Sequence, residues 1–163
     1  MPDIVVPPNL ESLTKRIIGC GIAVHRALGP GLLESAYREC MVIELGLVGL
    51  KVAREQHVPI FYRGQRIPTS LRLDLLVDEV VVVELKAVEK VHPIHLAQVI
   101  SYLKLGDRPA GLLMNFNMTS LRQGLHRVDH PQLKGQISRS PSADRSSEAE
   151  EPAVADQSAC PEL

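Results

Sequence analysis

Two consecutive apolar runs, at residues 71–77 and 80–86, constrain the fold of this chain more than any other feature. Both are rich in Leu and Val and are separated by a short acidic turn, which predicts a β-hairpin of buried strands. The first run nevertheless carries Asp74, and the second carries Glu84 and Lys86. A buried charge is costly unless it is paired or bound to a metal. These three residues are therefore the first candidates for chemistry.

The register of this hairpin decides whether the three charges meet. Glu84 and Lys86 are two residues apart and project from the same face of their strand. Asp74 joins them only if it pairs with Glu84, which requires an odd-numbered loop such as residues 78–80. A two-residue turn would place Asp74 opposite Val83, on the other face, unless a bulge intervenes.

Two carboxylates that converge on one point form a site for a hard divalent cation, which completes its coordination with water and substrate phosphate. A neighbouring lysine can stabilise developing negative charge or orient an attacking water. The alternative is a structural ion cluster in which Asp74 pairs with Arg72 or Lys86. Glu-x-Lys alone is a weak signal, and the two apolar strands around it strengthen the functional interpretation.

The remaining pattern predicts an α/β domain with a small mixed β-sheet flanked by helices. The elements expected are a helix with Asn9 as N-cap that ends at Leu28, a helix over 32–45, strands within 52–62, a helix over 93–105, a strand over 110–116 and a helical turn over 120–124. On the second helix the expected buried face consists of Leu33, Ala36, Tyr37, Cys40 and Ile43.

Composition divides the 163 residues into three parts. Residues 1–9 contain three prolines and form an extended lead-in, and residues 10–135 form the domain. Residues 136–163 have no aromatic residue and a net charge of -4, which predicts a disordered acidic tail. The preceding 135 residues have 16 Lys and Arg against 13 Asp and Glu, a mildly basic balance that is compatible with a polyanionic partner.

Membrane insertion and secretion are not predicted. The longest apolar run has eight residues, far short of the roughly 20 that a membrane helix needs. The N-terminus has Asp3 where a signal peptide would be basic, so we expect a cytoplasmic protein. The three cysteines have no CxxC spacing, and we interpret Cys20 and Cys40 as buried thiols rather than disulfide or zinc ligands.

Residues 31–37, Gly-Leu-Leu-Glu-Ser-Ala-Tyr, have the form of the motif that names the GxxExxY family. Asp74 with Glu84-Leu-Lys86 resembles the signature of the PD-(D/E)XK nuclease superfamily, to which that family is assigned. The similarity covers roughly 13–128, although no proline precedes Asp74 as is common in the superfamily. It implies a restriction-endonuclease-like core.

The resemblance also implies roles for individual residues. Asp74 and Glu84, with the backbone carbonyl of Leu85, would ligate Mg²⁺ or Mn²⁺, and Lys86 would serve the nucleophilic water. Glu34 matches a glutamate that several branches, including Holliday-junction resolvases, place beside the metal.

Gln98 and Tyr102 resemble the QxxxY element of helicase-associated nucleases, and their i, i+4 spacing puts both on one helix face. Each candidate has a structural alternative. Glu34 could pair with Arg38 one turn later, Tyr37 and Tyr102 could be core aromatics, and Gln98 could satisfy backbone groups.

His92 and His95, three residues apart at the start of the third helix, could imitate a metal pair. We interpret them as helix-end residues because the sequence supplies no third ligand.

Two functions remain open at this stage. The first is a Mg²⁺-dependent nuclease that hydrolyses phosphodiester bonds in nucleic acid, with DNA as the expected substrate. The second is a non-catalytic module that keeps the fold and binds nucleic acid or protein. The mildly basic domain has five aromatic residues, too few for a large single-strand platform. A compact domain that contacts double-stranded or branched DNA, alone or as a homodimer, fits better.

Overall fold

The computed structural model of the protein describes residues 3–133. Residues 3–9 form neither helix nor strand and lead into the first helix. The predicted acidic tail, residues 136–163, lies outside the described residues.

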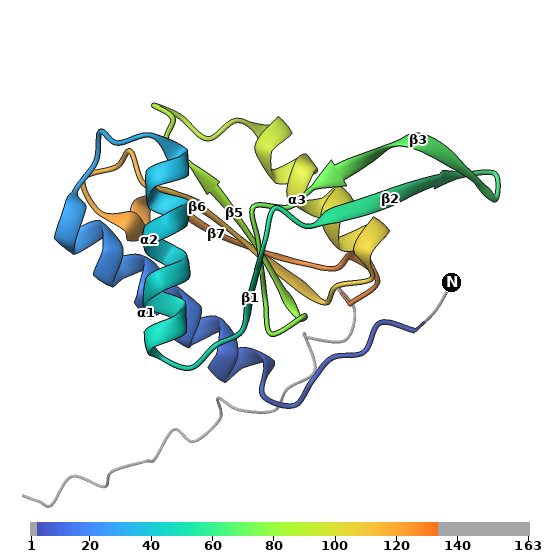
Figure 1. The fold of residues 1–163 in the computed structure, drawn as a ribbon, viewed down its shortest axis with the longest axis horizontal. Helices are drawn as coiled ribbons and strands as arrows, with labels where there is room; N and C mark the ends of the chain where they lie inside the picture. The colour runs from blue at the N-terminus through green and yellow to red at the C-terminus, as the bar shows by residue number, and fades with distance from the viewer. Residues whose placement is uncertain (1–2, 134–163) are drawn as a thin grey trace, which may run out of the picture.

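A five-stranded mixed sheet forms the centre of the fold (Figure 1). Its strands, in spatial order, are β1 (Val52–Arg54), β4 (Leu75–Val77), β5 (Val81–Lys86), β6 (Ala110–Asn115) and β7 (Leu125–Asp129). The central strand β5 is antiparallel to β4 and parallel to β6. Because parallel strands are usually buried on both faces, helices are expected on both sides of β5. The small mixed sheet flanked by helices is therefore confirmed.

Three helices supply that cover. On one face, α1 (Leu10–Leu28) and α2 (Glu34–Leu47) pack over the sheet, and α3 (Pro93–Gly106) covers the other as the crossover between the parallel strands β5 and β6. Gly111 in β6 allows α3 to lie close, since a Cβ at this position would be 2.6 Å from the Val99 side chain. Two 3₁₀ helices, η1 (Leu121–Gly124) and η2 (Pro131–Leu133), flank β7.

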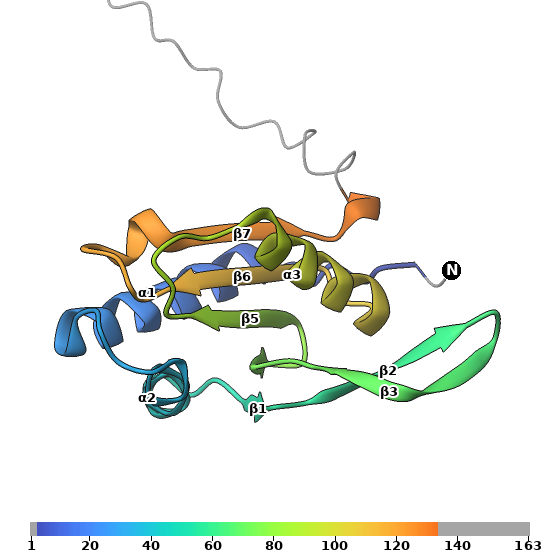
Figure 2. The same ribbon diagram turned by 90° about the horizontal axis from the view of Figure 1, so that it is seen from above.

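The strands β2 (His57–Tyr62) and β3 (Gln65–Arg72) form a separate two-stranded sheet. Figure 2 shows this hairpin extending beyond the main sheet, away from α1 and α2. The strand predicted over 71–77 is in fact divided at Leu73 and Asp74, so that its ends belong to β3 and β4. Most of β3 and all of β7 were not predicted, because their residues lack an apolar run.

The buried face of α2 differs from the prediction. Tyr37, Met41 and Leu45 are buried, whereas Leu33 is 77% exposed and Ile43 is 64% exposed. Apolar residues occur all around this helix, so their spacing does not select one face. The face is instead fixed by contact with the sheet and α1.

Alternation along β5 divides the interior into two clusters. Val81, Val83 and Leu85 belong to the cluster under α1 and α2. Val82 belongs to the smaller cluster under α3, and Glu84 and Lys86 follow it on that same face. The charges predicted to carry chemistry therefore lie at the α3 side of the carboxyl end of β5.

Candidate active site

The hairpin register brings Asp74 beside the end of β5. Leu75 pairs with Val83 and Val77 pairs with Val81, which leaves the three-residue loop 78–80. The odd-numbered loop is therefore confirmed. Asp74 comes just before β4, and its Oδ2 accepts a 2.9 Å hydrogen bond from the backbone N–H of Leu85.

Asp74 is held on its other side by an arginine that the sequence did not single out as a site residue. Its Oδ1 lies 3.2 Å from Nη1 of Arg38 on α2, and Arg38 also lies 3.5 Å from Glu55. Arg72 pairs with Glu55 at 3.2 Å. Arg72 and Lys86, the partners that the structural alternative gave to Asp74, pair instead with Glu55 and Glu84. The sequence did carry one indication that Arg38 belongs to this site, because it lies one helical turn after the candidate Glu34.

Glu84 is a buried carboxylate with one unsatisfied oxygen. Its Oε1 accepts a 2.5 Å contact from Nζ of Lys86, but its buried Oε2 has no hydrogen-bond partner. The residue is 2% exposed. Burial, and then the charge of Asp74, raise the pKa of Glu84 to about 7 despite the opposing effect of Lys86. An unpaired buried carboxylate oxygen costs free energy that a cation would recover.

Lys86 is held as a cation by its surroundings. Burial alone would lower its pKa, but the hydrogen bond and charge of Glu84, followed by the charges of Glu34 and Asp74, raise the pKa of Lys86 above its usual value. The ammonium group is therefore protonated at neutral pH.

Glu34 begins α2 and lies within electrostatic reach of the same groups. Burial raises the pKa of Glu34, the charge of Lys86 lowers it, and the charge of Asp74 raises it again. Arg38, the structural partner expected for Glu34, forms its ion pairs with Asp74 and Glu55.

Gln98 and Tyr102 approach the site from α3. Gln98 Nε2 donates a 2.5 Å hydrogen bond to the Tyr102 hydroxyl, so Gln98 contacts a side chain rather than the backbone. Tyr102 is buried in the α3 cluster, and its pKa is raised by burial and then by the charge of Glu84. It is therefore both a core aromatic and a neighbour of the carboxylates.

Tyr37 is a core aromatic residue, which is the structural alternative considered for it from the sequence. Its ring stacks on Phe116 at a centroid distance of 4.4 Å. Its hydroxyl donates to the Gly29 carbonyl at 2.6 Å and accepts from the Leu32 N–H at 3.1 Å. Tyr37 thereby fixes the loop before α2, and with it the position of Glu34.

Asn115 is a second residue that the sequence analysis missed. It is the register partner of Lys86 across β5 and β6 and is fully buried. Its Oδ1 accepts from the Val88 N–H at 3.0 Å, and its Nδ2 donates to the Val88 carbonyl at 2.8 Å. Asn115 therefore anchors the segment between β5 and α3. The sequence did carry an indication of this role, because Asn115 is a polar residue at the end of an otherwise apolar strand.

His92 and His95 cap α3. The backbone N–H of His92 donates to Nδ1 of His95 at 3.2 Å, and the N–H of His95 donates to the His92 carbonyl at 3.0 Å. The helix-end interpretation is confirmed.

Within residues 3–133, no group of three or more His, Cys, Asp or Glu side chains is arranged to hold a metal ion by itself. The site offers two buried carboxylates, one with an unpaired oxygen. This donor set fits Mg²⁺, which proteins commonly hold through one or two carboxylates while water and substrate phosphate fill the other positions.

A mixed sheet with an aspartate, a glutamate and a lysine at the end of its central hairpin defines a restriction-endonuclease-like protein. The family model of the PD-(D/E)XK nuclease superfamily matches residues 11–128, and the chain belongs to this superfamily. Its members are generally nucleases that typically use divalent metals. No curated protein and no solved structure gave a significant match. Membership of the GxxExxY family stays a prediction.

In the part of the chain that the structure describes, no helix is both long and apolar enough to span a membrane.

Proposed function

We propose that the protein is a divalent-metal-dependent nuclease that hydrolyses phosphodiester bonds in DNA. The observation that carries the proposal is the unpaired, buried Oε2 of Glu84, next to Asp74 and Lys86 at the end of β5. A structural ion cluster would satisfy both oxygens of each carboxylate. The unsatisfied atom instead favours a site that is completed by a cation and its phosphate ligand.

Asp74, Glu84 and the backbone carbonyl of Leu85 would hold Mg²⁺ or Mn²⁺, which when bound polarises a phosphoryl oxygen and lowers the pKa of a coordinated water. Arg38 and the Leu85 N–H hold the Asp74 carboxylate in a fixed orientation. Lys86 supplies a fixed positive charge where negative charge develops on the phosphate.

Glu34 and the Gln98–Tyr102 pair flank these groups from two helices. We assign Glu34 to the positioning of the attacking water, because the carboxylate lies within electrostatic reach of Lys86 and Asp74. Gln98 would act through Tyr102, to which it is hydrogen-bonded and whose pKa responds to the charge of Glu84.

The test is a cleavage assay of the purified full chain on supercoiled, linear, branched and single-stranded DNA, with Mg²⁺, Mn²⁺, Ca²⁺ or EDTA. We expect cleavage with Mg²⁺ or Mn²⁺, and binding with little turnover in Ca²⁺, a larger ion with looser geometry. Robust cleavage in excess EDTA would overturn the metal mechanism. DNA binding without cleavage under any metal condition would favour the non-catalytic module.

A further inference from the structure

The β2–β3 hairpin differs in charge from the rest of the domain. Residues 56–73 contain Arg63, Arg66 and Arg72 and have neither Asp nor Glu. The rest of residues 1–135 has equal numbers of basic and acidic residues, 13 of each. The whole positive excess of the domain therefore lies on one projecting element (Figure 2).

The hairpin tip also has the two exposed aromatic rings of this chain. Tyr37, Tyr102 and Phe116 are buried, whereas Phe61 is 58% exposed and Tyr62 is 66% exposed. Exposed apolar side chains that gather in one place, unlike single ones, are typical of an interaction surface.

Each exposed ring has an arginine beside it. Arg66 is the cross-strand partner of Phe61, so both side chains leave the same face of the hairpin. The Arg63 guanidinium lies over the Tyr62 ring, 5.6 Å from its centre. Paired guanidinium and aromatic groups are suited to a phosphate backbone and the sugars and base edges next to it.

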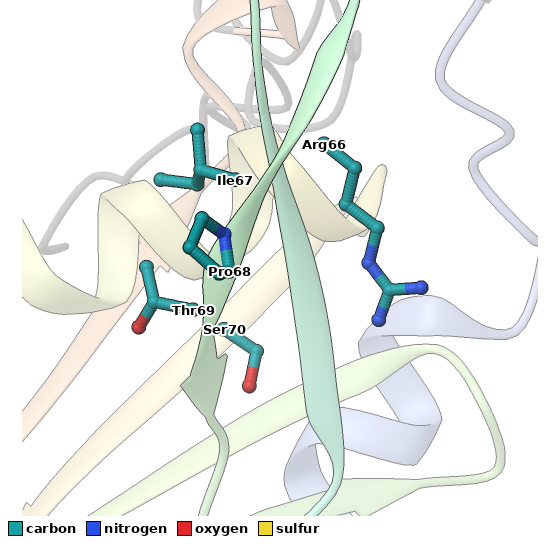
Figure 3. Close-up of a pocket in the computed structure, with 5 residues that line it drawn as sticks. All are labelled: Arg66, Ile67, Pro68, Thr69 and Ser70. Carbon is teal, nitrogen blue, oxygen red and sulfur yellow. The ribbon is translucent and has the colours of Figure 1, made fainter.

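A hollow of about 370 Å³ continues this surface along β3. It is lined by Arg66, Ile67, Pro68, Thr69 and Ser70. Figure 3 shows Arg66 on one side of the strand, with Ile67 and Thr69 on the other. The hairpin therefore offers hydroxyl, guanidinium and apolar groups over much of its length.

The base of the hairpin is connected to the candidate active site. Arg72 pairs with Glu55, Glu55 with Arg38, and Arg38 with Asp74. Val58, on the neighbouring strand at the same base of the hairpin, packs in the α3 cluster, which also contains Tyr102. The base of the hairpin therefore lies beside the carboxylates, while its tip extends away from the main sheet (Figure 2).

We propose that the β2–β3 hairpin is a substrate-binding arm that enters a groove of duplex DNA and binds its phosphate backbone through Arg63 and Arg66, with Phe61 and Tyr62 against the sugars. A two-stranded ribbon has the width that the major groove admits. This inference rests on the proposed nucleic-acid substrate and adds the surface that holds it.

A second copy of the chain is a less suitable occupant. Pro59 and Pro68 each remove a backbone donor from a two-stranded sheet, which disfavours the addition of another strand. Two arms that each carry three arginines and no acid would also repel one another.

The test compares two double variants of the full chain with equal loss of charge. Arg63→Gln/Arg66→Gln removes the two arginines at the tip of the arm, and Arg26→Gln/Arg122→Gln removes two exposed arginines on α1 and η1. Binding of a labelled DNA duplex is followed by fluorescence anisotropy in Ca²⁺ over a series of salt concentrations. Thermal melts check folding, and size-exclusion chromatography reports the oligomeric state.

We expect the arm variant to bind at least about tenfold more weakly, and the magnitude of its salt slope to fall by about two, one for each lost phosphate contact. The control should change affinity by less than about threefold. Equal losses in the two variants, or an arm variant that binds like the parent, would overturn the proposal. A change of oligomeric state without a change in DNA affinity would assign the arm to a second copy instead.

The outcomes also separate this inference from the proposed function. Arm-dependent binding without cleavage under any metal condition would remove the nuclease assignment and keep the arm. Metal-dependent cleavage together with arm-independent binding would keep the nuclease and remove the arm. As a second variant, Phe61→Ser/Tyr62→Ser should weaken duplex binding with little change in salt slope, because it removes no charge.

Discussion

The six residues of β5 alternate between two faces of the sheet, and the two faces contribute differently to the protein. On the face under α1 and α2, Val81, Val83 and Leu85 are fully buried among apolar neighbours. On the face under α3, the strand ends with Glu84 and Lys86, and one oxygen of Glu84 has no partner. The first face stabilises the fold. The second face lowers the stability of the fold, because it buries an unpaired carboxylate oxygen where chemistry is expected. Active sites commonly lose stability in this way in exchange for function.

A second contrast lies within the polar face. Asp74 is fixed on both oxygens, by Arg38 and by the Leu85 N–H. Glu84 has one ionic partner, Lys86. The aspartate is thus held in one orientation by the protein itself, and the glutamate is the group with the most to gain from a cation.

The largest expected effect comes from Glu84→Gln, which keeps the shape of the polar face and removes its charge. We expect the cleavage rate to fall at least about 1,000-fold, because a metal ligand is lost from the reacting centre. Cleavage of supercoiled DNA in Mg²⁺ measures it. Glu89→Gln, at an exposed glutamate between β5 and α3, is the matched control and should cleave like the parent. Equal activity of the two variants would contradict the assignment.

Leu85→Ala tests the apolar face one residue away. We expect the free energy of unfolding to fall by about 3 kcal/mol, as is typical when a buried Leu side chain leaves a cavity. Cleavage well below the melting temperature should change by less than about fivefold, since the backbone at this position is kept. Denaturant unfolding and the same cleavage assay measure the two effects. A stable but inactive variant would show that the two faces are not separate in function.

The third prediction concerns pH. The pKa of Glu84 is raised from 4.5 to about 7 in the fold, so its contribution to stability is full below pH 4.5 and is lost as the pH rises through 7. The metal-free parent should therefore lose about 3 kcal/mol of unfolding free energy between pH 4.5 and pH 8 relative to Glu84→Gln. Denaturant unfolding in EDTA across this range measures it. Parallel pH profiles for the two proteins would contradict the burial of an unpaired charge.

The last variant is Lys86→Ala, for which we expect the cleavage rate to fall by about 10- to 100-fold, less than for Glu84→Gln. The ammonium acts on charge that develops in the transition state, so metal binding should remain. Single-turnover cleavage and calorimetric titration with Mg²⁺ separate the two. A variant that cleaves like the parent would remove Lys86 from the mechanism.

The sequence predicted where the three charges lie in the sheet better than it predicted their partners. The register of Asp74 followed from strand periodicity, because a one-residue slip would have moved a charge to the apolar face. The partner of Asp74 could not be predicted in the same way. Arg38 reaches Asp74 across 36 positions of sequence, whereas local spacing suggested Glu34 as the partner of Arg38, and Arg72 or Lys86 as the partner of Asp74.

The buried face predicted for α2 was partly wrong for a related reason, since Tyr37 is buried as predicted but Ile43 is exposed. Apolar residues surround this helix, and the stacking of Tyr37 on Phe116, from a distant part of the chain, selects the buried face. Short strands such as β7 escaped prediction because their half-buried residues acquire strand geometry by pairing with β6.

The most direct test of the central claim is the thermal melt of the full chain at pH 8 with and without Mg²⁺, for the parent and for Glu84→Gln. If the unpaired carboxylate is a metal ligand, saturating Mg²⁺ should raise the melting temperature of the parent by about 5 °C or more and leave the variant unchanged. The metal-free variant should melt above the metal-free parent. A parent indifferent to Mg²⁺, beside a destabilised variant, would contradict the metal site and assign Glu84 and Asp74 to a structural ion cluster.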